Sequence, residues 1–284
     1  MSNTTETAVS EQAAHDWREA GEAWGHSAVD WACLYEHYAL DAMMAIFQRV
    51  GVGVGERFGE GVRLLDMACG SGLAIRHATA MGATTSGIDA AESLIAIATD
   101  RNPDSDVRLG SMFELPWDDE SFDAVISING IWGGCEAALA EAFRVLRPGG
   151  TFGMSFWGTG TPNDMRGCFK AFARHAPEQH FDSMKRLNNI AAAGTAEAML
   201  GDAGFEVIER GARVSTIEWP DEELAWRALS SVGPAVPALR HTAPEIVRRA
   251  ALEAIEHCRD ERGIYRFRND HHFVIARKAL NNVG

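Results

Sequence analysis

The stretch Leu64–Ala74, with the sequence LLDMACGSGLA, contains the strongest structural signal in the chain. Apolar residues lead into Asp66, two glycines follow within a run of small residues, and a helical pattern begins at Leu73. Seventeen residues after Gly72, a second acidic residue, Asp89, ends another apolar run. On an open parallel sheet, such glycines let the backbone approach a nucleotide-like ligand, and the carboxylate after the next strand reaches its ribose hydroxyls. The spacing therefore predicts a nucleotide-like cofactor.

Length, composition and charge exclude several classes of protein. The chain has 284 residues, of which 46% are hydrophobic and 23% are charged, as in an ordinary globular protein. Its net charge of −14 argues against nucleic acid as a partner, because a phosphate backbone binds to basic surfaces. The sequence has neither a long apolar run that predicts a membrane span nor the pattern of a secretory signal at its start. We expect a cytoplasmic monomer or homodimer whose partner is a small-molecule acceptor.

The five cysteines are scattered along the chain, and no two of them form a C-x-x-C pair. This spacing predicts neither a zinc site nor a disulfide framework, so we expect no metal. An odd number of isolated cysteines is typical of a reducing compartment.

Strand and helix patterns alternate through the middle of the chain. Predicted strands lie at 62–67, 84–88, 107–109, 122–128 and 151–157, with helices at 73–80, 93–99 and 136–146 between them. Two further strands are expected at 205–217 and 264–276. Such alternation indicates βαβ crossovers and predicts an α/β fold with a doubly wound, mostly parallel, seven-stranded, Rossmann-like sheet.

The segments outside this pattern predict a tail, a lid and a cap. The expected parts are a disordered tail at 1–12, an N-terminal helical lid at 13–55, the core at 56–219 and 263–284, and a helical cap insertion at 220–262. The lid contains an apolar helix face formed by Leu40, Met43, Met44 and Phe47. In the cap, Thr242 is expected to cap a helix, with Glu245 three residues further on.

Three segments, taken in this order and spacing, resemble the class I S-adenosylmethionine-dependent methyltransferases of the small-molecule type. They are 65–72 (LDMACGSG), 115–123 (LPWDDESFD) and 141–150 (EAFRVLRPGG). The resemblance covers roughly residues 62–157, and the stretch 23–32 also resembles the entry helix of one bacterial branch of the family. It implies S-adenosyl-L-methionine as cofactor and S-adenosyl-L-homocysteine as product.

The resemblance implies a role for each residue around the glycine loop. The backbone of Ala68, Gly70 and Gly72 would hold the amino-acid end of the cofactor, and Asp66 would orient this loop and the cofactor's ammonium group. Asp89 would accept hydrogen bonds from both ribose hydroxyls. Read without the resemblance, Asp66 is also compatible with a helix cap, and Asp89 with an ordinary turn.

At the adenine, the resemblance places Ala90 on one side of the ring and Met112 and Phe113 on the other. Ser111 stands where the family usually has an acid that binds the adenine amino group, and a serine hydroxyl makes a weaker contact. Met112 and Phe113 are equally compatible with simple core packing.

At the methyl-donor end, the resemblance places Asn129 and Gly130, and Trp31 of the lid is a further candidate for the cofactor site. The acceptor is expected between the loop after residue 128, the aromatic lid and the cap, in surroundings with few fixed charges, which favours a small, largely apolar molecule. A hydroxyl acceptor needs a general base, whereas a carboxylate needs none, and O-methylation of either remains open. The catalytic candidates are His26, Asn129 and Tyr35, and further base candidates are His37, His271 and His272.

Two other functions stay open. One is a cofactor-binding protein without catalysis that acts as a sensor or assembly partner. The other is a nicotinamide-dependent oxidoreductase, which is disfavoured because Ile75 stands where the dinucleotide fingerprint has its third glycine.

Overall fold

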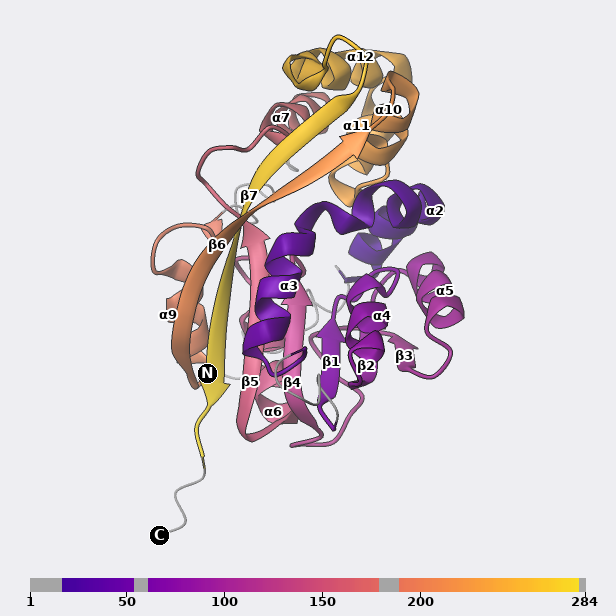
Figure 1. Cartoon of the computed structure of the whole chain (residues 1–284). Coiled ribbons are helices and arrows are strands. Elements are labelled where there is room, and N and C mark those ends of the chain that lie inside the picture. The colour runs from indigo at the N-terminus through magenta and orange to yellow at the C-terminus, as the bar shows by residue number, and fades with distance from the viewer. Residues whose placement is uncertain (1–16, 54–60, 179–188, 281–284) are drawn as a thin grey trace, which may run out of the picture.

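A seven-stranded sheet runs through the molecule (Figure 1). The computed structural model describes residues 17–53, 61–178 and 189–280, so the predicted tail at 1–12 lies outside the described residues. The strands are β1 (Arg63–Met67), β2 (Thr84–Asp89), β3 (Asp106–Leu109), β4 (Phe122–Ile128), β5 (Leu146–Trp157), β6 (Phe205–Trp219) and β7 (Tyr265–Lys278). Their order is β3-β2-β1-β4-β5-β7-β6, in which β7 pairs antiparallel with both neighbours and all other pairs are parallel. The predicted doubly wound, mostly parallel sheet is confirmed.

Helices cover both faces of this sheet. The helices of the core are α3 (Leu40–Arg49), α4 (Leu73–Ala80), α5 (Glu92–Arg101), α6 (Glu136–Val145) and α9 (Thr195–Asp202). Apolar residues of α3 and α4 pack on one face, and those of α6 and α9 pack on the other. The central strands are covered on both sides, which explains why β4 (FDAVISI) reads as a nearly continuous apolar run.

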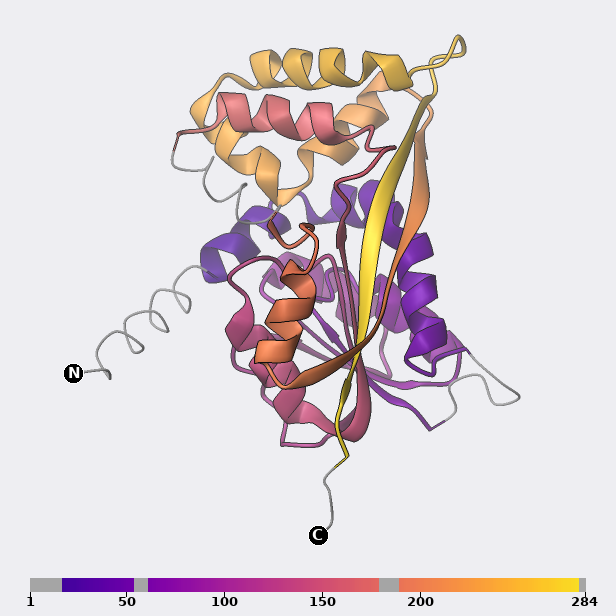
Figure 2. The same cartoon turned by 90° about the vertical axis from the view of Figure 1, so that its left-hand side faces the viewer.

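The two longest strands, β6 and β7, form a twisted antiparallel ribbon that continues beyond the core and carries a second layer of helices (Figures 1 and 2). These helices are α7 (Arg166–His175), α10 (Glu222–Ser230), η3 (Gly233–Ala235), α11 (Val236–His241), α12 (Pro244–Ile255) and η4 (Glu256–Cys258). Their apolar faces enclose the aromatic side chains of Trp219, Tyr265 and Phe267 from the ribbon. We call this layer of helices the cap; it includes α7, which lies outside the predicted insertion at 220–262. The cap has a hydrophobic cluster of its own, continuous with the N-terminal aromatics Tyr35 and Tyr38.

The N-terminal segment passes between the cap and the core. Residues 17–25 are helical and are followed by α2 (Ala28–Asp30), a π-helical turn η1 (Trp31–Tyr35) and a 3₁₀ turn η2 (Glu36–Ala39), which leads into α3. A π turn widens the helix locally and often marks a functional segment. This irregular stretch carries the aromatic residues that the sequence assigns to the lid.

The predicted cap at Thr242 is wrong. Helix α12 begins at Pro244, its N-cap is Ala243, and no side chain there bonds to the helix. The hydroxyl of Thr242 instead donates to the carbonyl oxygen of His175, 2.9 Å away, and so joins the α11–α12 connection to the end of α7. The proline supplies the helical φ angle that starts α12.

All five cysteines are free thiols. No helix in the described part of the chain has the length and apolar character needed to cross a membrane.

We predict that Lys278→Met destabilises the protein by about 2–3 kcal/mol, because two carbonyl oxygens would lose a charged donor. The Lys278 ammonium is buried and donates to the carbonyls of Phe143 (2.8 Å) and Leu146 (2.7 Å) at the end of α6. Urea denaturation measures the difference. The matched control is Arg277→Met, which removes the same charge from an exposed neighbour and should change stability by less than about 0.5 kcal/mol. Equal effects of the two substitutions would contradict this account.

Candidate functional site

The glycine loop follows β1 and has a backbone that small residues permit. Ala68, Gly70 and Gly72 have φ angles of 60°, 56° and 80°, in the left-handed region that favours glycine. Gly72 is also the N-cap of α4. A Cβ atom placed on Gly70 would lie 2.7 Å from the indole ring of Trp31, so the lid rests directly on this loop.

Two carboxylates flank the loop, one partly buried (Asp89) and one buried (Asp66). Asp89, at the end of β2, accepts hydrogen bonds from the amides of Gly70 and Ala91, each 2.8 Å long. Each of its oxygens has a second lone pair, so it can still accept a hydroxyl donor. Asp66 is 2% exposed, and its Oδ1 has no partner among the described residues. These acceptors fit a ligand that carries a diol and an ammonium group.

Burial raises the pKa of both carboxyls. The pKa of Asp66 lies well above its usual range, first because the group is desolvated and second because Asp89 is close. The pKa of Asp89 is also raised by burial, and the amides of Ala91, Gly70 and Ala90 partly offset the effect. A cationic ligand group beside Asp66 would remove this penalty, which strengthens the fit to an ammonium.

The lid helix packs on the turn after β2. A Cβ atom on Gly21 would overlap the carbonyl oxygen of Ala90, and one on Gly25 would lie 2.6 Å from the hydroxyl of Ser93. That hydroxyl donates to the carbonyl of Gly25 over 2.7 Å. Glycine at both positions therefore allows the lid to approach the predicted adenine site at Ala90.

The residues after β3 form the opposite side of this region. Met112 is buried in the core cluster and Phe113 packs against that cluster from the edge. The hydroxyl of Ser111 accepts a hydrogen bond from the amide of Phe113, 3.1 Å away, and so stabilises its own turn. The structure places all three on the loop that the sequence predicts.

Two of the sequence segments that resemble the family hold each other in place. Arg144 donates to the carbonyls of Leu115 (2.9 Å) and Trp117 (2.8 Å), and to the carboxylates of Asp119 and Glu141. Glu141 in turn accepts from the amide of Leu115, 2.7 Å away. These motif residues fix the loop after β3 and have a structural role.

The loop after β4 meets the glycine loop. Asn129 has a φ angle of 55°, its Oδ1 accepts from the hydroxyl of Ser155 (2.9 Å), and its Nδ2 is buried with no partner among the described residues. A Cβ atom on Gly130 would lie 2.5 Å from Cβ of Ala68. Two non-glycine residues with positive φ, Ala68 and Asn129, thus stand on touching loops, and strained backbone of this kind concentrates at functional sites.

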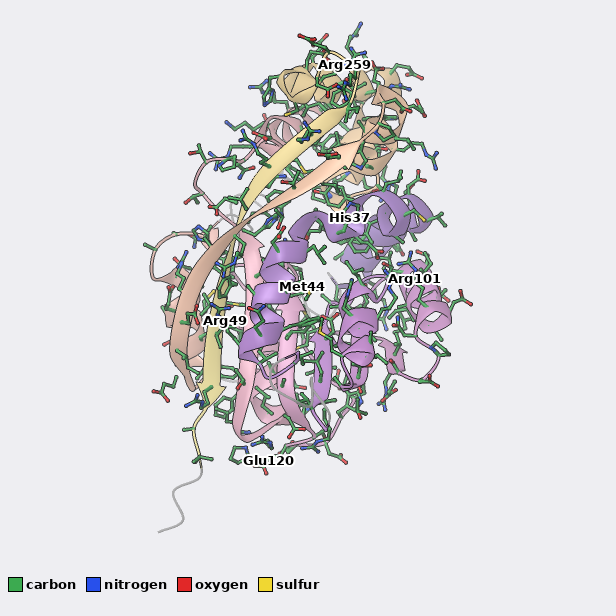
Figure 3. The ribbon with its side chains drawn as sticks, viewed as in Figure 1. His37, Met44, Arg49, Arg101, Glu120 and Arg259 are labelled. Carbon is green, nitrogen blue, oxygen red and sulfur yellow. The ribbon has the colours of Figure 1, made fainter. Side chains whose placement is uncertain are left out.

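An ion pair that the sequence analysis missed fastens the lid. Arg101, at the end of α5 (Figure 3), donates to both carboxylate oxygens of Glu36 at 3.0 and 2.9 Å. The hydroxyl of Ser71, in the glycine loop, also donates to Glu36, whose side chain is only 7% exposed. Arg101 further donates to the carbonyl of Ala32, 3.3 Å away. Glu36 and Arg101 are far apart in the sequence, and no local sequence pattern identifies this ion pair.

The predicted base candidates in the lid have polar contacts of their own. The ring nitrogens of His26 lie 2.8 Å from the carbonyl oxygen of Ala23 and 2.9 Å from that of Ser230, which joins the lid to the cap. Tyr35 is 1% exposed and its hydroxyl donates to the sulfur of Met165 over 3.4 Å. Burial raises the pKa of Tyr35 well above its usual range.

Tyr38, by contrast, lies next to Asn129. Burial raises the pKa of Tyr38 to about 12, and the nearby Asn129 side chain partly offsets the effect. The ring of Tyr38 stacks on Trp157, with 5.5 Å between the ring centroids, and meets His271 edge-on at 5.6 Å. Tyr38 is not among the site residues predicted from the sequence, although it lies in the predicted aromatic lid.

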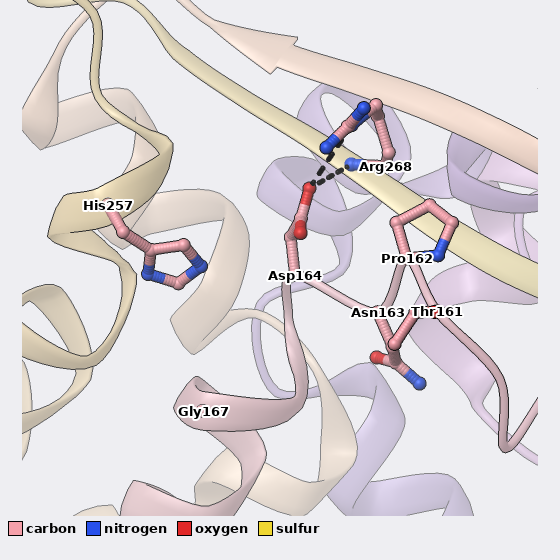
Figure 4. Close-up of a pocket in the computed structure, with 7 residues that line it drawn as sticks. All are labelled: Thr161, Pro162, Asn163, Asp164, Gly167, His257 and Arg268. Atoms are coloured by element: carbon pink, nitrogen blue, oxygen red, sulfur yellow. Dashed lines mark hydrogen bonds and ion pairs between the residues drawn. The ribbon is translucent and has the colours of Figure 1, made fainter.

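A separate polar cluster lies in the cap, beside a cavity of about 530 Å³ (Figure 4). The ligand-type atoms of Asp164, His257 and Cys258 lie within 4.8 Å of one another. Asp164 is paired with Arg268, whose amide donates to it over 2.8 Å, and burial with the charge of Asp164 raises the pKa of Cys258 to about 12. Metals bind thiolates, so a protonated thiol and a carboxylate already paired with an arginine make a poor metal site.

Comparison with known protein families agrees with this geometry. The family model described as "Methyltransferase domain" matches residues 65–154, from β1 into β5. This stretch contains the glycine loop, Asp89 and Asn129. Residues 65–154 form a class I S-adenosylmethionine-dependent methyltransferase domain. The cofactor is S-adenosylmethionine, and the unpartnered Asp66 oxygen and the glycine cradle fit its amino-acid end.

Individual relatives support the same family. A protein of Mycolicibacterium smegmatis described as an S-adenosylmethionine-dependent methyltransferase is 34% identical over 147 residues, which are 51% of this chain and 52% of that protein. This chain therefore spans only about half of that relative. A malonyl-[acyl-carrier protein] O-methyltransferase of Serratia marcescens is 27% identical, with 68% of this chain and 72% of that protein covered. The 27-O-demethylrifamycin SV methyltransferase of Amycolatopsis mediterranei is 38% identical over 32% of this chain and 36% of its own.

Solved structures share the fold. A protein from Bacillus halodurans C-125, classed as a methyltransferase, superposes with a TM-score of 0.56 at 18% identity, covering 84% of this chain and 100% of its own. A [4+2]-cyclase superposes with a TM-score of 0.54 at 19% identity, covering 88% and 85%. At such low identities these similarities show the fold alone.

We predict that S-adenosylhomocysteine binds more tightly as the pH rises toward the raised pKa of Asp66 in the free protein. Below that pKa the carboxyl is protonated, and binding of the ammonium must release the proton. Calorimetry in buffers of different ionisation enthalpy measures the protons released. Asp66→Asn should lose most of this pH dependence, and a wild-type affinity that does not change over the same range would contradict it.

The Asp66 carboxyl also makes the stability of the free protein depend on pH. Because folding raises the pKa of Asp66, its contribution to stability is present below the ordinary pKa and is lost as the pH rises through the folded value. The melting temperature of the free protein should therefore fall over this range more steeply than that of the S-adenosylhomocysteine complex.

We predict that Glu36→Gln speeds release of S-adenosylhomocysteine, because Arg101 and Ser71 lose a charged partner that holds the lid on the glycine loop. Removing one member of a largely buried pair should weaken lid closure by about 1–3 kcal/mol, which corresponds to roughly ten-fold or faster dissociation. Stopped-flow tryptophan fluorescence measures the rate. Asp41→Asn, at an exposed position on α3, is the control. Unchanged dissociation from Glu36→Gln would show that the lid does not close through this pair.

Proposed function

We propose that this protein transfers a methyl group from S-adenosylmethionine to an oxygen atom of a small, largely apolar molecule. The observation that carries the proposal is the pair of carboxylates on either side of one glycine loop, the buried Asp66 and the partly buried Asp89. S-adenosylmethionine supplies an electrophilic methyl group when it is bound. The rest of the chemistry depends on how the chain's own residues position the acceptor and exclude water.

Each part of the site would have a distinct task. Asp89 would accept the ribose hydroxyls while it holds the amide of Gly70, and Asp66 would pair with the ammonium group. Trp31, which covers Gly70, would exclude water from the loop, with Glu36 holding the lid closed. Asn129 would present its free amide at the methyl-donor end.

One observation supports oxygen as the methylated atom, and a second supports an apolar acceptor. The relatives from Serratia marcescens and Amycolatopsis mediterranei have names that describe O-methylation of one acceptor and methylation of an O-demethyl compound. The surroundings of Asn129 toward the cap are aromatic, with Tyr38, Trp157 and Trp219 in one continuous cluster. Uncharged aromatic walls favour an apolar acceptor body.

A cofactor-binding protein without methyl transfer is the alternative. The same fold also occurs in a [4+2]-cyclase, so the fold alone does not establish methyl transfer. The experiment must therefore measure binding and turnover separately.

We predict that Asp89→Ala weakens S-adenosylhomocysteine binding by about one to a few kcal/mol, because it removes charge-assisted hydrogen bonds. Isothermal titration calorimetry measures the affinity, and Asp104→Asn, an exposed acid in the turn before β3, is the control. In parallel, the wild type is incubated with methyl-labelled S-adenosylmethionine and panels of phenols, alcohols, fatty acids and amines. Binding with transfer to oxygen supports the proposal, transfer to nitrogen alone contradicts it, and tight binding without any turnover favours the alternative.

A further inference from the structure

An unusual row of polar side chains lies inside the aromatic cap cluster. His271 and Asn269 alternate along one face of β7, and Ser215 is the register partner of Asn269 on β6. All three are almost completely buried, with 0%, 0% and 1% of their surface exposed. The same face carries Phe267 and Tyr265, which pack into the apolar core of the cap.

Most of the unpartnered polar atoms of the described chain lie along this row. Both ring nitrogens of His271, Nδ2 of Asn269 and Oγ of Ser215 are buried without a hydrogen-bond partner, and so is Nδ2 of Asn129. These are five of the seven such atoms among the described residues. A buried polar group without a partner costs about 1–3 kcal/mol, and a ligand that inserts along the row and hydrogen-bonds to these atoms would remove that cost.

The row is connected to the methyl-donor end. The ring of His271 lies 4.7 Å from that of Trp157 and 5.6 Å from that of Tyr38, measured between centroids. Tyr38 in turn lies beside Asn129, whose loop touches the glycine loop at Ala68. A molecule bound along β7 therefore reaches the donor end through uncharged aromatic contacts.

The charges around His271 decide which acceptor group fits. Burial lowers the pKa of His271 to about 4; the backbone of Asn269 partly offsets this effect, and the charge of His272 adds to it. His272 points to the other face of the sheet, where its Nδ1 accepts from Arg210 over 3.0 Å and its Nε2 lies 3.0 Å from Asp270. The register partner Arg213 is exposed, and its guanidinium lies 5.6 Å above the ring of Phe273. A buried carboxylate would thus face a neutral imidazole, which is unfavourable.

We propose that this face of the β6–β7 ribbon binds the acceptor and that the methylated group is a hydroxyl whose proton is taken by His271. This inference rests on the proposed function and narrows its acceptor from carboxylate or hydroxyl to hydroxyl. Asn269 and Ser215 hydrogen-bond to a second polar group of the acceptor, and Tyr38 and Trp157 contact its apolar body.

The step is balanced without a further reactant. The hydroxyl oxygen forms the new bond to the methyl carbon while the carbon–sulfur bond breaks, and the electron pair of that bond stays on sulfur. The hydroxyl proton passes to a ring nitrogen of His271, which is neutral and therefore able to accept it. The imidazolium then returns the proton to solvent when the product leaves.

The test uses matched acceptors that differ only in the nucleophile. The full-length protein saturated with S-adenosylhomocysteine, with its histidines labelled by ¹⁵N, is titrated with 2-naphthol or with 2-naphthoate. The His271 resonances are assigned by their loss in His271→Gln. We expect naphthol to shift the ring nitrogens of His271 and naphthoate to leave them unchanged. A shift with naphthoate alone, or with neither compound, overturns the inference.

Turnover gives the second readout. With methyl-labelled S-adenosylmethionine and the pairs 2-naphthol/2-naphthoate and 1-octanol/octanoate, the label should appear on the hydroxyl compounds. His271→Gln should lower kcat by about 10²–10⁴-fold, the range for loss of a general base, with unchanged affinity for S-adenosylhomocysteine. His272→Gln, on the opposite face, should keep the activity. Preferred methylation of the carboxylates, or full activity in His271→Gln, overturns the inference.

Failure of the proposed function can be distinguished from failure of the inference about His271. If S-adenosylhomocysteine does not bind and no acceptor is labelled, the proposed function itself is wrong. If it binds and methyl transfer occurs to a carboxylate, the function stands and only the role of His271 is lost.

Discussion

The hydrogen bond from the amide of Gly70 to the carboxylate of Asp89 is the interaction on which the site depends. It joins the loop after β1 to the end of β2, and it is possible because Gly70 adopts a positive φ angle. The same carboxylate accepts from the amide of Ala91 at the start of the next turn. One partly buried carboxylate thus fixes two strand ends, and its second lone pairs remain for a diol.

The lid covers the glycine loop that Asp89 holds. Trp31 lies on Gly70, and the π turn that begins at Trp31 leads to Glu36, where Arg101 and Ser71 bind. The cover and its fastening are therefore one short segment. Because the Glu36–Arg101 ion pair and the Trp31 contact lie in one segment, a change in the ion pair is expected to alter how Trp31 covers the glycine loop.

The sequence places the glycine loop and Asp89 at neighbouring strand ends, but it does not show which residues lie around Asn129 on the side of the cap, and the reason is physical. The glycine loop and Asp89 are separated by one βα unit, so hydrophobic periodicity and spacing carry the information locally. Tyr38 and His271 meet from opposite ends of the chain, and only the course of the antiparallel ribbon brings them together. The predicted N-cap role of Thr242 is wrong for a similar reason, because its hydroxyl donates to the carbonyl oxygen of His175 on another helix. Long-range contacts of this kind leave no periodic trace in a single sequence.

The separation between the cofactor end and the acceptor end of the site has a structural consequence. The predicted cofactor contacts come from the loops after β1, β2 and β4 in the core, whereas the polar row comes from β6 and β7, which carry the separate cluster of the cap. A change at Ser215 or Asn269 alters a surface that shares no hydrogen bond with Asp66 or Asp89 among the described residues. The buried polar row also weakens the core of the cap, since apolar side chains in its place would pack without unpartnered atoms. That loss of stability is explained if the row meets the polar groups of an acceptor.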